Sequence, residues 1–164
     1  SSFVDKKKDL LGGLYEEREE PVMANQVIKG ARFHHIALKV KDIDLAERFY
    51  LEGLGFTKCG QWGEGDGRAL MVDMGDGGII EIFAGGREDA PCLEDASSLS
   101  GSFFHLAIGV DDARAAFQRA IENGATEKVY PKELTLKTLP NPTDVVLAFV
   151  YGPNGEVIEF MQHK

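Results

Sequence analysis

The chain of 164 residues has few of the residues that mark several specialised classes of protein. Its two cysteines, Cys59 and Cys92, form no Cys-x-x-Cys pair and no Cys/His zinc spacing, which argues against a disulfide framework. No apolar run approaches the roughly 20 residues of a membrane-spanning helix, and the N-terminus lacks the apolar core of a signal peptide. We therefore expect a cytoplasmic protein with no membrane as partner.

Positive charge is also scarce. The 18 lysines and arginines are outnumbered by 27 aspartates and glutamates, which gives a net charge of -9. A surface for nucleic acid needs clustered basic side chains to neutralise phosphates, so this balance argues against DNA or RNA as a partner. The length and the 43% hydrophobic content suit one compact domain, or two small modules that share a sheet.

The apolar pattern predicts a strand, a helix and three further strands, and this order occurs twice. The first helix begins after Asp42, a good N-cap residue, and ends at Gly53. The second begins after Asp112 and ends at Asn123. The expected strands lie near 33–40, 56–62, 68–74, 78–84, 103–110, 126–135, 144–151 and 156–162.

The two halves are an internal repeat. Residues 76–81 match residues 154–159 at an offset of 78, whereas the earlier matches have an offset of 70, so the second copy is longer. The earlier matches pair Phe33, His35, Ala37, Val40, Asp42 and Ala46 with Phe103, His105, Ala107, Val110, Asp112 and Ala116. We predict an α+β fold of two tandem βαβββ modules, 31–84 and 102–164, that form one curved, mostly antiparallel sheet. Residues 1–30 are expected to be an N-terminal extension and 85–101 a linker.

Each repeat has a histidine on its first strand and a glutamate on its last, namely His35 with Glu81 and His105 with Glu159. A carboxylate in a strand as apolar as VIEFM, residues 157–161, is costly unless it is paired or bound to a cation. Because side chains alternate along a strand, the ligands are expected on the faces away from the helices. These four side chains can converge if the sheets curve toward a shared cavity.

Two imidazoles and two carboxylates suit one divalent metal ion of intermediate hardness and leave coordination positions open. A single strand histidine is more often an ordinary core residue. Two histidines and two glutamates at matched repeat positions favour a metal cavity with His35, Glu81, His105 and Glu159 as its ligands.

The chain from Ala31 to Gln162 resembles the vicinal oxygen chelate superfamily, in which paired βαβββ modules form a metal cavity. The segments FYLEGLGF at 49–56 and GPNGEVIEF at 152–160 carry the resemblance. Within the superfamily, the ligand order His, Glu, His, Glu is that of bacterial glyoxalase I. The resemblance therefore implies a lactoylglutathione lyase-like metalloenzyme with nickel, cobalt or zinc. It also implies a homodimer with ligands contributed across the interface.

The implied reaction isomerises the hemithioacetal of a 2-oxoaldehyde, such as methylglyoxal, and a thiol to a 2-hydroxyacyl thioester. The metal would bind the two vicinal oxygens and stabilise the enediolate. Glu159 is our candidate for the base that moves the proton, with Glu81 as the alternative, because the repeat makes them equivalent. An epimerase of the methylmalonyl-CoA type and a non-catalytic small-molecule binding module remain as alternatives.

The resemblance identifies the metal ligands more closely than it identifies the substrate. Glyoxalases that use glutathione generally have an arginine and an asparagine at the positions of Lys39 and Gly85. Lys39 is a candidate substrate-binding residue, but it lacks the two-pronged guanidinium of arginine. Glutathione or another thiol is therefore expected as co-substrate.

Overall fold

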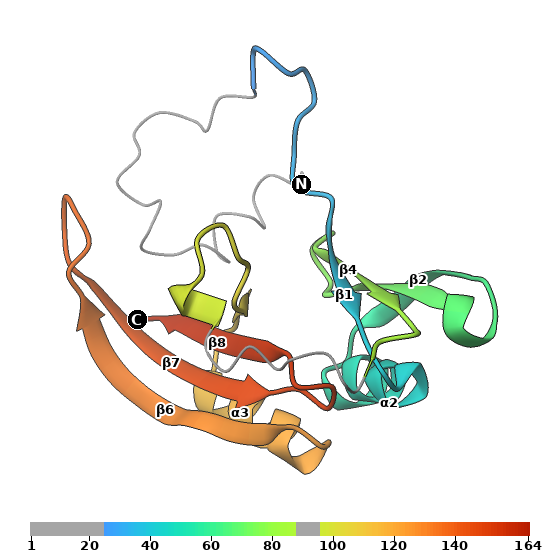
Figure 1. The fold of residues 1–164 in the computed structure, drawn as a ribbon. Helices are drawn as coiled ribbons and strands as arrows, with labels where there is room; N and C mark the ends of the chain where they lie inside the picture. Colours follow the sequence, from blue (N-terminus) through green and yellow to red (C-terminus); the bar gives the residue numbers. More distant parts are fainter. Residues whose placement is uncertain (1–24, 88–95) are drawn as a thin grey trace, which may run out of the picture.

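In the computed structural model, residues 25–87 and 96–164 are described, and they form two modules of similar architecture (Figure 1). Most of the predicted N-terminal extension, and residues 88–95 of the predicted linker, lie outside the described residues. Cys92 lies there too, whereas Cys59 is a free, exposed thiol in the first module. No helix of the described residues is long and apolar enough to cross a membrane.

The first module is a four-stranded sheet in the order β1-β4-β3-β2. The pair β1–β4 is parallel and the other two pairs are antiparallel. Asp42 caps the helix by accepting a hydrogen bond from the Leu45 N–H, as its sequence position predicts. The elements are β1 (His35–Lys39), α2 (Ile43–Arg48), a π-helical turn (Phe49–Gly53), β2 (Thr57–Trp62), β3 (Ala69–Asp73) and β4 (Ile79–Phe83).

The second module repeats this arrangement with the order β5-β8-β7-β6, and again only the pair that contains the first strand is parallel. Asp112 caps its helix through hydrogen bonds from the N–H groups of Arg114 and Ala115. The elements are β5 (Leu106–Gly109), α3 (Ala113–Glu122), β6 (Thr126–Leu136), β7 (Thr143–Tyr151) and β8 (Val157–His163).

The core lies between each sheet and its helix. Ile80 and Ile82 of β4, and Ile158 and Phe160 of β8, are all at most 2% exposed and belong to one hydrophobic cluster. Side chains alternate along a strand, so the glutamates between these residues point to the opposite, helix-free faces. The apolar spacing that forms the core therefore also places the charged residues away from it.

The α+β fold with two repeated modules is confirmed, but the described strands do not form the single curved sheet that was predicted. The strands form two separate four-stranded sheets, because the edge strands β1 and β5 do not pair with one another. The modules meet instead through side chains next to the helices. Tyr50 donates a hydrogen bond of 2.8 Å to Oε1 of Glu156, and Arg119 Nε donates one of 2.8 Å to the Gly53 carbonyl.

Candidate functional site

The first pair of candidate ligands meets across β1 and β4. Glu81 lies opposite Ala37 in the parallel register, on the same face as His35. Nε2 of His35 is 3.2 Å from Oε2 of Glu81, and the two side chains are 35% and 14% exposed. We call His35 and Glu81 the first half-site.

The ring of His34 joins this half-site, which the sequence did not indicate. Neighbouring residues of a strand point to opposite faces, but β1 begins at His35, so the backbone of His34 is irregular. Nδ1 of His34 lies 2.7 Å from Nδ1 of His35, a hydrogen bond in which one nitrogen donates and the other accepts. His34 can therefore fix the orientation of the His35 ring while Nε2 faces Glu81.

The second pair repeats the geometry across β5 and β8. Glu159 lies opposite Ala107, and its Oε2 is 3.1 Å from Nε2 of His105. His105 immediately precedes β5, whose first residue is Leu106, so this strand starts later than the sequence predicted. The ring of Phe149 contacts the His105 ring edge to face at 5.6 Å. We call His105 and Glu159 the second half-site.

Glu159 is the more deeply buried of the two candidate bases. It is 4% exposed and is the single buried charged residue among the described residues. Burial raises the pKa of its carboxyl, and the nearby His105 partly opposes this shift. A carboxylate in this position gains strongly from a neighbouring cation because it has little water to stabilise its charge.

The described residues of one chain keep the half-sites apart. Within residues 25–87 and 96–164, no three His, Cys, Asp or Glu side chains come close enough to hold a metal ion together. Each half-site nevertheless offers one imidazole and one carboxylate, a donor set that zinc, nickel and cobalt accept. The residues thus fit a divalent metal when the half-sites combine, and the four-ligand site stays a prediction.

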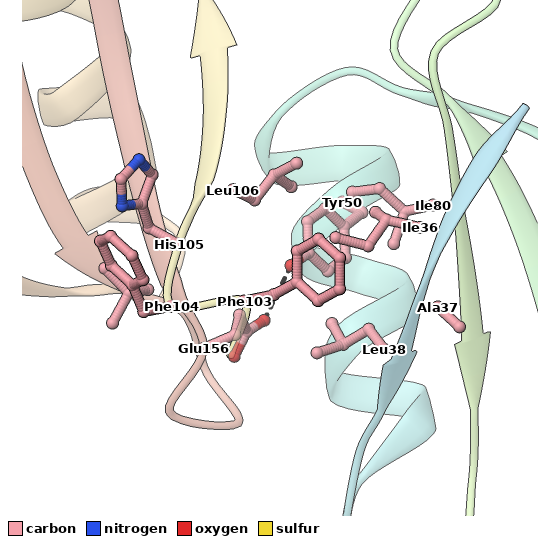
Figure 2. Close-up of a pocket in the computed structure, with 11 residues that line it drawn as sticks. Ile36, Ala37, Leu38, Tyr50, Ile80, Phe103, Phe104, His105, Leu106 and Glu156 are labelled. Carbon is pink, nitrogen blue, oxygen red and sulfur yellow. Dashed lines mark hydrogen bonds between the residues drawn. The ribbon is translucent and has the colours of Figure 1, made fainter. Parts of the chain in front are cut away.

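A cavity of about 250 Å³ lies between the modules and includes only one of the four candidate ligands, His105 (Figure 2). Residues 36–38 of β1 line one side, and residues 103–106 line the other. The hydrogen bond between Tyr50 and Glu156 lies beside it. The walls of the cavity are mainly apolar. The cavity therefore lies between the two sheets but does not bring the candidate metal ligands together.

Lys39, the candidate substrate-binding residue, lies on the face of the first half-site. Its ammonium is 5.9 Å from the centroid of the Phe83 ring, which contacts Trp62 edge to face at 5.9 Å. The sequence did not identify Trp62 as part of the site, because its position opposite Ala69 depends on the pairing of β2 with β3. The one sequence feature that could have pointed to Trp62 is its place directly before the glycine-rich turn at residues 63–67.

The backbone at Gly85 explains why this chain lacks the asparagine that glutathione-using glyoxalases generally have at this position. Its φ is +78°, and a Cβ placed there would lie 2.9 Å from the Asp66 carbonyl oxygen and 3.5 Å from Lys39 Nζ. An asparagine would be strained in this backbone conformation and would crowd Asp66. The local backbone therefore favours glycine at a position where glutathione-using enzymes carry an asparagine.

Comparison with curated proteins gives two relatives. An uncharacterised protein of Bacillus subtilis, YwbC, is 31% identical over 139 residues, which cover 80% of this chain and 97% of YwbC. A probable lactoylglutathione lyase of Vibrio parahaemolyticus is 28% identical over 145 residues, which cover 84% of this chain and 94% of the relative.

Comparison with solved structures supports the fold. The crystal structure of TnmS3, an antibiotic-binding protein from Streptomyces sp. CB03234, superposes with a TM-score of 0.58 at 23% identity, covering 85% of this chain and all of TnmS3. The family model that matches residues 32–160 spans both modules and both half-sites. The chain therefore belongs to the Glyoxalase/Bleomycin resistance protein/Dioxygenase superfamily.

Proposed function

We propose that this protein is a metal-dependent, glyoxalase-I-like lyase that converts the hemithioacetal of a 2-oxoaldehyde and a thiol to a 2-hydroxyacyl thioester. The observation that carries the proposal is the repeated His–Glu pair. His35 and Glu81 lie 3.2 Å apart on the helix-free face of one sheet, and His105 and Glu159 lie 3.1 Å apart on that of the other. The similarity to the probable lactoylglutathione lyase supports the same activity.

The four side chains of the half-sites would hold the metal, which we expect to be nickel, cobalt or zinc. When bound, such an ion supplies Lewis-acid polarisation of the substrate oxygens. Glu159 would take the proton from the carbon that bears sulfur and deliver it to the neighbouring carbon. Glu81 is the alternative base.

The half-sites are proposed to combine in a homodimer, the first half-site of one copy with the second of the other. This assembly is consistent with the separation of the half-sites in one chain. It also gives each dimer two equivalent sites related by the two-fold axis.

The test is metal analysis of the purified protein, followed by a thioester assay with methylglyoxal and several thiols after loading with nickel, cobalt or zinc. Glu159→Gln should retain much of the metal but lose turnover by about 100-fold or more, because the base is lost. Glu127→Gln removes an exposed carboxylate of β6 and serves as the matched control. Unaltered turnover of Glu159→Gln would refute its role as base.

A non-catalytic binding module is the second candidate function. The structural similarity to an antibiotic-binding protein supports it. This candidate predicts a protein without bound metal and without turnover after loading. Exchange of a substrate proton with solvent, without thioester formation, would instead indicate an epimerase.

A further inference from the structure

One row of residues crosses the whole first sheet on its helix-free face. Trp62 of β2 is the register partner of Ala69 in β3, and Ala69 is the partner of Phe83 in β4. Phe83 is in turn the partner of Lys39 in β1. We call Trp62, Ala69, Phe83 and Lys39 the Trp62 row.

The row combines an aromatic surface with a positive charge. The rings of Trp62 and Phe83 meet edge to face at 5.9 Å over the small Ala69, which is fully buried. Trp62 is nevertheless 43% exposed, so much of its ring surface faces outward. An exposed tryptophan beside a second ring is a surface on which another planar ring gains contact area and favourable quadrupole interactions.

The charge of Lys39 is available to a ligand. In the described part of the chain Lys39 forms no ion pair, and its Nζ lies over the Phe83 ring. Gly85 next to it has no side chain, so nothing at that position covers the ammonium. An ammonium on a protein with a net charge of -9 is a local centre of attraction for an anion.

The row lies next to the first half-site. Phe83 is two residues along β4 from Glu81 and on the same face, which corresponds to about 7 Å. A molecule bound at Glu81 therefore reaches the row with a group of only a few atoms.

The second module shows that the fold does not require such a row. Its corresponding row, read from the register of β6, β7, β8 and β5, is Lys132, Leu147, Met161 and Gly109. It has no aromatic residue, and glycine takes the place of Lys39. Its lysine, Lys132, takes the place of Trp62 on the opposite edge strand. The pair of aromatic rings with a lysine beside the half-site is thus specific to one of two otherwise similar sheets, as expected of a recognition surface.

We propose that the Trp62 row is a recognition subsite for an aromatic ring that carries a carboxylate. The ring lies against Trp62 and Phe83, and the carboxylate pairs with Lys39 Nζ. A neutral ring loses the ion pair, and a saturated ring loses the stacking. This subsite rests on the proposed function in one respect, namely that the aromatic carboxylate is treated as part of the substrate. Binding of such a molecule to the Trp62 row itself requires neither metal nor turnover.

Trp62 is the only tryptophan of the chain, so its fluorescence reports directly on the row. We suggest titrating the metal-free protein with three probes, benzoate, cyclohexanecarboxylate and benzamide. Benzoate should change the fluorescence and bind about fivefold tighter than either of the other two. Phe83→Leu, which keeps an apolar side chain but removes the ring, should weaken benzoate binding about fivefold. Lys39→Met should remove the preference for benzoate over benzamide.

Tyr130→Ala is the matched control, because Tyr130 is an exposed aromatic residue that packs on Phe117 in the other module. It should leave benzoate binding unchanged. Equal binding of the three probes, or benzoate binding that is insensitive to Phe83→Leu and Lys39→Met, would overturn the proposal. Failure of the thioester assay alone would refute the proposed function and leave this subsite intact.

Discussion

Nε2 of His105 lies 3.1 Å from Oε2 of Glu159, because Glu159 lies opposite Ala107 in the parallel pairing of β5 with β8. The same relationship between β1 and β4 brings His35 to Glu81 at 3.2 Å. Each module therefore carries half of a candidate metal site on the face that its helix leaves free. The predictions below concern the assembly, orientation and stability of these halves.

The first prediction concerns assembly across two copies. His35→Gln and His105→Gln should each be inactive alone, because each lacks one ligand in every site. Mixed and reassembled, they form heterodimers in which one site contains both substitutions and the other contains neither. Activity should return to about a quarter of the wild-type value if subunits mix at random. No recovery, once native mass spectrometry shows heterodimers, would indicate a site within one chain.

The second prediction concerns His34. Replacement by phenylalanine, the residue at the equivalent position 104 of the second repeat, removes the hydrogen bond to His35. We expect the metal affinity to fall about 10- to 100-fold, because a ligand histidine loses the partner that orients its ring. Calorimetric titration with nickel or zinc measures this change. His163→Gln, which removes a histidine of β8 outside both half-sites, should have a much smaller effect, and equal effects would contradict the role of His34.

The third prediction concerns the contact between the modules. Tyr50 is fully buried, and its hydroxyl donates a hydrogen bond of 2.8 Å to Glu156. Tyr50→Phe should lower the free energy of unfolding by about 1–3 kcal/mol, because the carboxylate loses a partner in a partly buried site. Urea denaturation followed by circular dichroism measures the change. Tyr130→Phe, at an exposed tyrosine, should stay close to wild type.

The fourth prediction is a pH dependence from Glu156. Burial raises the pKa of its carboxyl, although the hydrogen bonds from Tyr50 and from the Asn154 N–H oppose the shift. The unfolded chain has no such burial, so the folded state binds the proton more tightly than the unfolded state does. The stabilisation is complete below pH 4.5 and is lost as the pH rises through the raised pKa.

Glu156→Gln cannot ionise and should show a weaker dependence. Measured by urea denaturation between pH 4 and 8, the wild type should lose stability relative to this variant as the pH increases. Parallel curves for the two proteins would show that Glu156 does not titrate differently in the folded state.

The faces of the candidate ligands could be predicted from the sequence because the alternation of side chains along a strand is a local property. Their role as metal ligands stays a prediction. The spacing of Glu81 and Glu159 between buried apolar residues already assigns them to the face away from the helix. The order of the strands around each helix follows from the same apolar periods.

Relationships between distant elements were not predictable in this way. The contact of Tyr50 with Glu156 depends on how the modules pack, and it accompanies two separate sheets where one was expected. Trp62 joins Lys39 only through the register of four strands. His34 lies outside β1 because this strand begins at His35, two residues later than the apolar pattern predicts.

The most direct test of the account is equilibrium metal binding by the wild type, His35→Gln, His105→Gln and the double variant. We predict one nickel or zinc ion per chain for the wild type, a large loss for either single variant, and little further loss for the double variant. This pattern follows because the half-sites act as one unit. Retention of tightly bound metal by either single variant, with full loss only in the double variant, would contradict a shared site.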